Sequence, residues 1–483
     1  MGPSSRPHRP LRILSVNTRD LGGGAERVAW NLFAGYRNRG HASRLAVGTN
    51  DSLDADVVLL PNDASRTAWS RLWLSLSRPL HDRERSHSWA RPLRLLLAGI
   101  GDPARAATQL LGHEDFHYPG TRHLLELFPG MPQIVHAHNL HGGYFDLRQL
   151  PRIARSLPTV LTLHDAWLFS GHCAHSFECD GWRSGCGHCP DLAIYPAVAR
   201  DATAFNFRRK RMIYSKSAPY VAVPSQWLAR RLVDSMLAPA AREIKVIPNG
   251  VDLGTFAPVN RDKVREQLGL PRNALTLLFA ANGILRNPWK DIRTLRDAVG
   301  IAAKSFPEQT VLLVALGEDA PAERSGDAEI RFLPYQSDID VIAAYYCAAD
   351  LYVHAARAET FPNTVVEALA SGTPVVASAV GGVLDQVRGL RLPGADPNQA
   401  AYGLEEGTGV LVRPGDPVAL AAAIVALGMD PNLRRRLGEN GARDARRRFD
   451  RDVQVTTYLE WFYHILESRT AEGGHANQGS GTP

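Results

Sequence analysis

The segment 349–377 constrains the fold of this chain more than any other stretch of its sequence. Residues 349–354 are largely apolar and are typical of a buried strand. A helix is predicted to begin at Pro362, because the first N–H of a helix has no internal partner and proline is tolerated there. The helix ends at Ser371-Gly372, and residues 373–377 begin a second strand. Strand, helix and strand in succession are the repeat of an α/β sheet.

Two carboxylates lie on this unit, eight positions apart. Glu367 is predicted to lie on the helix among aliphatic neighbours, where a carboxylate is costly unless a partner hydrogen-bonds it. The two vicinal hydroxyls of a ribose would be such a partner. Glu359 precedes the helix, near amide groups that favour anions. The alternative is that Glu359 only complements the helix start while Glu367 reaches water.

The spacing of the two glutamates, followed by Ala-Leu-Ala-Ser-Gly-Thr-Pro-Val-Val-Ala, resembles the donor-site signature of the retaining, two-domain (GT-B) glycosyltransferases of family 4. The resemblance extends from about Leu11 to the Arg-rich helices near residue 450, and residues 113–237 resemble bacterial exopolysaccharide and cell-wall members. It implies an α/β fold of two facing Rossmann-like, doubly wound domains with a central cleft. It also implies that Glu367 holds the nucleotide ribose and that Glu359 faces the donor sugar as a catalytic residue.

The resemblance and the turn signals divide the chain. The turn Pro248-Asn-Gly250 marks the crossing between domains. The expected segments are a disordered arm at 1–10, an acceptor-side Rossmann-like domain at 11–250 with a cysteine-rich insertion at 172–190, a nucleotide-sugar-binding Rossmann-like domain at 251–450, a terminal helix at 451–470 that crosses back to the first domain, and a disordered tail at 471–483.

Two kinds of loop follow predicted strands of the first domain. The loop that ends in Gly23 and Gly24 precedes a helix, so its N–H groups either receive a phosphate or merely turn the chain. The loop after residues 133–136 carries His138, Asn139 and His141, at the strand end where ligands bind in parallel sheets. The resemblance places the glycines near the donor phosphates and the acceptor, and the second loop on the acceptor side.

His164 follows another apolar strand, 159–163. By the resemblance it lies beside the donor sugar and stabilises the charge that develops at the anomeric carbon, which makes it a catalytic residue. The alternative is a histidine that caps a helix or anchors a loop.

The first loop of the second domain, 281–291, contains Arg and Lys, which would neutralise the diphosphate leaving group. Lys290 matches the lysine of the family, with a solvated charge as the alternative. Asn282 or Gly283 stands where the family has arginine, so Arg286 is the substitute. The resemblance adds further donor-binding positions at Gly317, Phe361, Pro362, Asn363 and Thr364.

Four of the five cysteines, Cys173, Cys179, Cys186 and Cys189, fall within seventeen residues. Clustered thiols in a cytosolic enzyme favour a metal over disulfides, and four thiolates predict a closed, structural zinc site. Two disulfides or a redox pair are the alternatives. No cofactor is expected for catalysis itself.

The net charge of +6 suits a nucleotide-sugar diphosphate, an anionic membrane surface or nucleic acid. No nucleic-acid module is recognisable, which argues against the last. Residues 66–77 and 92–97 place Trp and Leu beside Arg, so they either lie on a membrane interface or pack on their own domain with arginines in water. No apolar run is long enough for a membrane span and the N-terminus lacks an apolar signal core, so we expect a cytoplasmic protein. Peripheral contact at the cytoplasmic face of the inner membrane is one interpretation.

These features predict a metal-independent, retaining glycosyltransferase of the hexosyltransferase type. It would transfer sugar from a nucleoside-diphosphate sugar to a hydroxyl of a glycan or lipid-linked acceptor, in bacterial polysaccharide or cell-envelope synthesis. A sugar-nucleotide epimerase or a phosphorylase of the same architecture, and a non-catalytic polysaccharide-assembly scaffold, are the alternatives.

Overall fold

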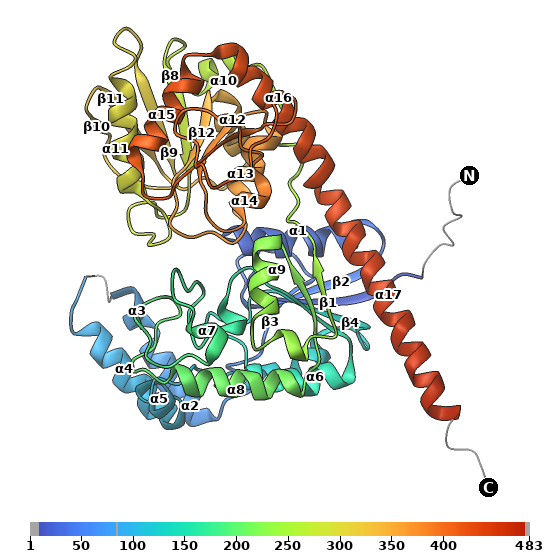
Figure 1. The fold of residues 1–483 in the computed structure, drawn as a ribbon. Helices are drawn as coiled ribbons and strands as arrows, with labels where there is room; N and C mark the ends of the chain where they lie inside the picture. The colour runs from blue at the N-terminus through green and yellow to red at the C-terminus, as the bar shows by residue number, and fades with distance from the viewer. Residues whose placement is uncertain (1–8, 84–85, 479–483) are drawn as a thin grey trace. The chain divides into compact units, whose positions relative to one another are not determined.

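The computed structural model describes residues 9–83 and 86–478, and the chain forms two compact units (Figure 1). Unit 1 contains the chain up to Val223, residues 229–245 and the chain from Tyr458 onward. Unit 2 contains residues 224–228 and 246–457. The sequence analysis put the crossing between the domains at residue 250; in the structure the continuous stretch of unit 2 begins at Val246.

Unit 1 is built on a sheet in the order β3-β2-β1-β4-β5-β6-β7. The sheet runs parallel from β3 to β6, and β4 and β5 are buried along their whole length, as expected when helices cover both faces. The strand order reverses at β1, which pairs with β2 on one side and with β4 on the other. The strands are β1 Arg12–Arg19, β2 Ala42–Thr49, β3 Val57–Leu59, β4 Ile134–Ala137, β5 Thr159–Thr162, β6 Tyr220–Val223 and β7 Glu243–Val246.

Helices connect these strands, and one connection is much longer than the others. Between β3 and β4 the chain inserts four helices, which lie together in Figure 1. They are α2 Ala68–Ser77, α3 Pro79–Arg83, α4 Ala90–Gly101 and α5 Pro103–Leu110. The other helices of this part are α1 Gly24–Asn38, η1 Pro119–Leu127, η2 Leu147–Gln149, α6 Leu150–Ser156, η3 Trp167–Phe169, α7 Gly181–Ser184, α8 Thr203–Ser215, α9 Gln226–Val233 and η4 Ala238–Ala240.

Unit 2 is built on a second sheet, in the order β10-β11-β9-β8-β12-β13-β14. Its strands pair in parallel except for the edge strand β10, and the order reverses between β8 and β12. The strands are β8 Leu275–Ala280, β9 Val311–Leu316, β10 Glu323–Ser325, β11 Ala328–Leu333, β12 Leu351–His354, β13 Val375–Ser378 and β14 Gly409–Val412.

Apolar side chains of this second sheet belong to two separate core clusters, one on each face. This is expected because successive side chains of a strand point to opposite faces of the sheet. The helices that cover it are α10 Arg261–Gln267, α11 Ile292–Ala303, α12 Ile339–Ala348, α13 Asn363–Ala370, α14 Val383–Gln386, α15 Pro417–Gly428 and α16 Pro431–Arg448. The predicted α/β class with two doubly wound domains is confirmed.

The last helix, α17 Arg451–Gln478, joins unit 1 from Tyr458 onward. Tyr458 lies 2.9 Å from the hydroxyl of Thr162 on β5, and the indole of Trp461 donates to Glu243 on β7 at 2.8 Å. The expected disorder from residue 471 is wrong as far as Gln478, because a helix that is already nucleated gains one hydrogen bond for each residue that it adds. Residues 479–483 lie outside the described part.

The expected disordered arm is also shorter than predicted. Residues 1–8 lie outside the described part of the chain, but the carbonyl of Arg9 accepts a hydrogen bond from Tyr463 of α17 at 3.0 Å. Arg9 is therefore tied to the terminal helix.

Candidate active site

The carboxyl ends of β8 and β12 form the centre of the candidate donor site in unit 2. The strand order reverses between these two neighbours, and in open α/β sheets ligands bind outside such a reversal. The loop after β8 carries Lys290 and the loop after β12 carries Glu359. Their side chains form an ion pair, and each is only 13% exposed. The ion pair thus joins the two loops that leave β8 and β12, the strands between which the strand order reverses.

The carboxylate of Glu359 also contacts a histidine of β12. The ring of His354, the last residue of β12, lies 3.0 Å from the Glu359 carboxylate, and the hydroxyl of Tyr352 lies 3.0 Å from the other nitrogen of that ring. Burial by itself would raise the pKa of Glu359, but Lys290 and His354 lower it from 4.5 to about 2. Burial and Lys290 lower the pKa of His354. Glu359 is therefore a fixed anion at neutral pH.

The backbone of Glu359 packs against the loop after β13. Gly381 has a φ of +55°, and a Cβ at this position would collide with the carbonyl oxygen of Glu359. Only glycine combines that conformation with that closeness. The sequence analysis missed both Gly381 and His354, although two signals pointed to them: a Gly-Gly pair after a strand, and a histidine at a strand exit like His164.

Glu367 lies on α13 and is 4% exposed, as predicted for a carboxylate among aliphatic side chains. It is not stranded, however, because the hydroxyl of Tyr346 on α12 donates to one of its oxygens at 2.9 Å. Burial alone therefore does not require a ligand hydroxyl at this position. Pro362 is the residue that caps α13, and the helix begins at Asn363, one position later than predicted.

The other predicted donor residues of unit 2 divide into packed and exposed positions. The ring of Phe361 packs edge-on against Phe449, and the side chain of Asn363 accepts from Asn249 at 3.1 Å. Thr364 lies in the first turn of α13. The carbonyl of Pro362 accepts a hydrogen bond from Gln386 at 3.0 Å. Gly317 follows β9, the strand beside β8. Arg286 is exposed on the loop after β8. The structure therefore brings Lys290 and Glu359 together but leaves Arg286 in solvent.

In unit 1 the reversal between β1 and β4 gathers two predicted loops. Gly23 caps α1 and Gly24 begins it, directly after the loop that leaves β1. Thr18 on β1 donates its hydroxyl to the carbonyl of His141 at 3.0 Å. This bond fixes the loop that carries His138, Asn139 and His141 beside the exit of β1.

Two of the predicted histidines are in direct contact. Nδ1 of His138 lies 3.0 Å from Nε2 of His164, and Nε2 of His141 lies 2.7 Å from the carboxylate of Asp165. Burial lowers the pKa of His164 from 6.5 to about 4, and burial with two neighbouring histidines holds the pKa of His138 well below 6.5. Both rings are therefore neutral near pH 7, and His138 orients His164 through one hydrogen bond.

The cysteine-rich loop follows His164 in sequence. All five cysteines of the chain are free thiols; Cys189 lies 3.3 Å from the His172 ring, and Cys347 is buried on α12. Within residues 9–83 and 86–478 no three His, Cys, Asp or Glu side chains have an arrangement that could hold a metal ion. In the described residues the four thiols are therefore not gathered around one point, and the zinc site at Cys173, Cys179, Cys186 and Cys189 stays a prediction.

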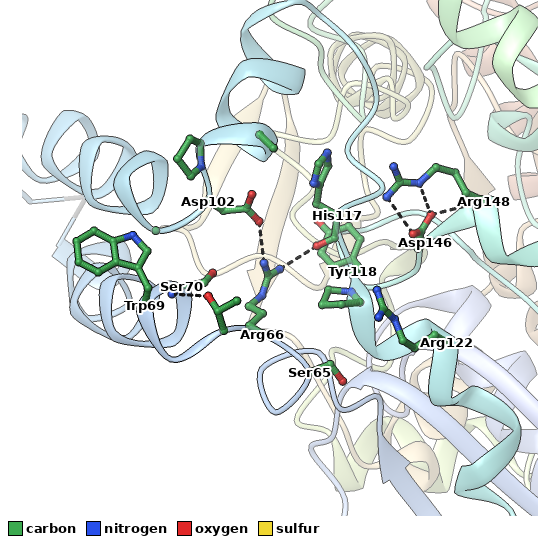
Figure 2. A pocket seen from close by; sticks show the side chains of 15 residues that line it. Ser65, Arg66, Trp69, Ser70, Asp102, His117, Tyr118, Arg122, Asp146 and Arg148 are labelled. Carbon is green, nitrogen blue, oxygen red and sulfur yellow. Dashed lines mark hydrogen bonds and ion pairs between the residues drawn. The ribbon is translucent and has the colours of Figure 1, made fainter.

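A separate pocket of about 460 Å³ lies in unit 1 between the inserted helices and η1 (Figure 2). Arg66 pairs with Asp102 at 2.9 Å and donates to the carbonyl of His117, while Arg148 pairs with Asp146 at 2.8 Å. Each of these two cations thus already has a carboxylate.

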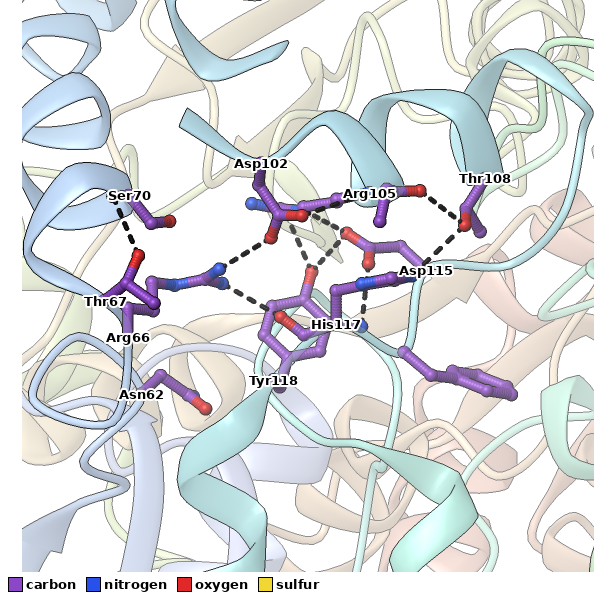
Figure 3. Close-up of polar contacts among 12 residues, drawn as sticks. Asn62, Arg66, Thr67, Ser70, Asp102, Arg105, Thr108, Asp115, His117 and Tyr118 are labelled. Carbon is purple, nitrogen blue, oxygen red and sulfur yellow. Dashed lines mark hydrogen bonds and ion pairs between the residues drawn. The ribbon is translucent and has the colours of Figure 1, made fainter. Parts of the chain in front are cut away.

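The polar network continues behind the pocket. Tyr118 donates to Asp115 at 2.9 Å, and Arg105 pairs with the same carboxylate (Figure 3). None of the predicted site residues lines this pocket. Arg66 and Arg105 tie the inserted helices to residues 115–118, directly before η1, so these charges serve the packing of unit 1.

Comparison with known proteins gives two family matches. Residues 22–255 match the family described as Glycosyltransferase Family 4, and residues 275–430 match the family described as Glycosyl transferases group 1. Together the two matches cover both units, including the strand exits that carry His164, Lys290 and Glu359.

Two curated relatives illustrate the similarity. The glycosyl transferase WcaC of Escherichia coli, named for colanic acid biosynthesis, is 26% identical over 51% of this chain and 60% of its own length. The D-inositol 3-phosphate glycosyltransferase of Xylanimonas cellulosilytica is 33% identical over 47% of this chain and 53% of its own length. The chain thus matches little more than half the length of these relatives.

Solved structures match over nearly the whole chain. Sucrose-phosphate synthase from Thermosynechococcus elongatus superposes with a TM-score of 0.58 at 18% identity, covering 95% of this chain and 100% of that one. Anabaena HepE, solved with UDP-glucose, gives 0.55 at 19% identity, covering 94% and 99%. These likenesses support the GT-B fold. Among the helices of the described residues, none is both long and apolar enough to cross a membrane.

Proposed function

Because the chain belongs to the glycosyltransferases of family 4, we propose that it transfers sugar from a nucleoside-diphosphate sugar to a hydroxyl of a glycan or lipid-linked acceptor. The reaction would serve polysaccharide or cell-envelope synthesis, as the name of WcaC indicates for that protein. The observation that best supports this function is the Lys290–Glu359 ion pair, at the point where the strand order of unit 2 reverses. Family membership favours this function over the epimerase, phosphorylase and scaffold alternatives.

In the donor half, Lys290 neutralises the diphosphate as it leaves. In the free protein its charge is matched by Glu359, so the arriving diphosphate competes with that carboxylate for the ammonium group. The first-turn N–H groups of α13 offer further donors, with Arg286 at the outer side. Glu367, to which Tyr346 already donates one hydrogen bond, receives the ribose hydroxyls with its carboxylate oxygens.

The acceptor half lies at the strand reversal of unit 1. His164, kept neutral and oriented by His138, would stabilise the positive charge of the transition state with its ring and backbone dipoles. Asn139 and His141, with Gly23 and Gly24, line the acceptor side. We propose retention of the anomeric configuration without a catalytic metal ion, since Lys290 and helix N–H groups supply the charge stabilisation.

The test is a binding screen with a panel of nucleotide sugars on the full chain. We expect at least one to bind, and Lys290→Ala to weaken that binding about tenfold or more. Lys304→Ala is the matched control, because Lys304 is exposed at the end of α11 in the same unit. No binding across the panel, or equal loss in both variants, would overturn the donor assignment.

Two further proposals accompany this function. Four cysteines within seventeen residues support a structural zinc ion that would organise the loop when bound. A basic, apolar insertion in unit 1 supports peripheral contact with the cytoplasmic face of the inner membrane.

A further inference from the structure

The four inserted helices of unit 1, residues 66–111, pack on one another in an unusual way; we refer to them as the insertion. The buried residues of α2 are Ser70 and Ser77, and those of α4 are Ala90 and Gly101. In a water-soluble helix pair the large apolar side chains lie at the contact and small or polar ones face solvent. Here the small residues lie inside.

The contact between α2 and α4 is close because of these small residues. A Cβ at Gly101 would lie 2.9 Å from the Cβ of Trp73 and 3.4 Å from the carbonyl oxygen of Ser70. Small residues that let two backbones approach closely are typical of helices that pack within lipid, where burying apolar side chains against each other gains nothing.

Several large apolar side chains of α2 and α4 are exposed. Trp69, Leu72 and Leu76 share one face of α2, at spacings of three and four, and are 57%, 54% and 51% exposed. Leu95 and Leu96 of α4 are also exposed. The indole N–H of Trp69 donates to the carbonyl of Ile100 at 2.9 Å, so its polar atom is satisfied while the ring remains accessible. Large apolar side chains exposed on two helices that pack together mark an interaction surface.

The net charge of the insertion indicates which kind of surface it would bind. The insertion contains eight arginines, no lysine and three acidic residues, hence a net charge of +5 against +6 for the whole chain. Arg71 and Arg91 are exposed on the two helices that carry the leucines. Leucine and tryptophan flanked by arginine suit a surface with an apolar interior and anionic head groups.

The length of the helices decides how they would meet such a surface. The helices α2 and α4 have 10 and 12 residues, whereas a membrane span needs about 20. They can therefore lie in the head-group region but cannot cross it. A Trp at that depth is favourable because its ring is amphipathic.

We propose that the insertion docks on an anionic lipid bilayer, with Trp69, Leu72, Leu76, Leu95 and Leu96 entering the head-group region and the arginines contacting lipid phosphates. The inference rests on the proposed membrane contact and deepens it by naming the surface. The docking holds the acceptor-side unit at the membrane, where a lipid-linked acceptor resides.

The experiment is co-sedimentation of the full chain with vesicles of phosphatidylcholine alone or of phosphatidylcholine with about 30% phosphatidylglycerol, whose surface is anionic. We expect binding to the anionic vesicles and weaker binding to neutral ones. The pair Leu72→Ser and Leu76→Ser should lower the partition coefficient at least about tenfold. Arg71→Gln and Arg91→Gln should each lower it about fivefold, and less so at high salt.

Controls separate this proposal from the donor site. Val418→Ser and Met429→Ser remove equally exposed apolar side chains from unit 2 and should leave vesicle binding unchanged. Nucleotide-sugar binding, measured on every variant, should also stay unchanged, so a failed donor site and a failed docking surface give different results. The arginine variants remove no packing and carry the test if the leucine variants unfold.

Three outcomes would overturn the proposal. They are the absence of vesicle binding, equal binding of the Leu72→Ser, Leu76→Ser variant, and equal binding of both arginine variants. If light scattering instead finds a dimer that the leucine substitutions convert to a monomer, with no vesicle binding, the patch belongs to a second copy of the chain.

Discussion

Lys290 and Glu359 form an ion pair although they stand 69 positions apart in the sequence. The pair joins the loops that follow β8 and β12, the two adjacent strands between which the sheet of unit 2 reverses. A diphosphate would enter a place where a cation is already positioned and held by a single buried carboxylate. Donor binding and the state of Glu359 are therefore coupled through one ammonium group.

Replacing Glu359 by glutamine keeps the size of the side chain and removes its charge. We expect kcat to fall about a hundredfold or more, because a fixed charge beside the donor sugar is lost. The Kd for the nucleotide sugar should stay equal or tighten, since Lys290 no longer shares its charge. Steady-state kinetics and calorimetry on Glu359→Gln test this, with exposed Glu405→Gln as the control. An unchanged kcat would remove Glu359 from the chemistry.

The same carboxylate should make the fold sensitive to acid. Its folded-state pKa of about 2 lies below the ordinary 4.5, so the unfolded chain takes up this proton first. The stabilisation is therefore complete above pH 4.5 and is lost as the pH falls toward 2. Urea unfolding across this range should show a shallower pH dependence for Glu359→Gln than for the natural chain. Parallel curves would contradict the assigned shift.

Glu367→Ala should weaken nucleotide-sugar binding about tenfold or more, because the ribose hydroxyls lose their acceptor. Tyr346→Phe is the informative partner variant, since it removes the protein hydrogen bond and keeps the carboxylate. It should cost about 1 kcal/mol of unfolding free energy and leave nucleotide affinity nearly unchanged. If both variants bind the donor equally well as the natural chain, Glu367 is a structural residue.

The histidines of unit 1 should also affect stability as the pH falls. The pKa of His164 in the fold is about 4 against an ordinary 6.5, so the unfolded chain is protonated first. The free energy of unfolding should therefore fall as the pH drops from 6.5 toward 4. His164→Asn should flatten this part of the profile, and proton NMR should find the His164 ring neutral at pH 6. A ring that titrates near 6.5 would show that it is not buried against His138.

The zinc prediction is tested by metal analysis of protein purified without chelators. We expect about one zinc per chain, lost in a Cys186→Ser, Cys189→Ser double variant, while Cys347→Ser, a buried thiol outside the loop, retains it. Metal-free protein with four titratable thiols in the loop would show that the cysteines serve another purpose.

The sequence was enough to predict the elements and the edges of the sheets that carry the site. The strand exits at His164 and the Glu359–Glu367 unit could be predicted because apolar strand segments and turn residues are local signals. What could not be predicted depends on neighbours that are distant in sequence. The contact of Lys290 with Glu359 follows from β8 lying beside β12, and Tyr346 reaches Glu367 from another helix. No spacing along the chain encodes either contact.

The sequence does not reveal the surroundings of Glu367 or the packed face of the inserted helices, and the physical reason is the same for both. Glu367 among aliphatic neighbours predicts a need for a ligand, because the sequence cannot show the tyrosine that satisfies it. The inserted helices offer two interpretations because a helical pattern of Leu and Arg does not say which face packs. The structure shows that Ser70 and Gly101 lie on the packed face.

The path of α17 has a consequence for synthesis. Thr162 and Glu243 receive their partners from Tyr458 and Trp461, which follow the whole of unit 2 in the chain. During synthesis on the ribosome, unit 1 therefore lacks these two contacts until more than two hundred residues after β7 have emerged. Residues that are translated after unit 2 complete the first part of the protein, so a message cut short before Tyr458 leaves the earliest-made unit unfinished.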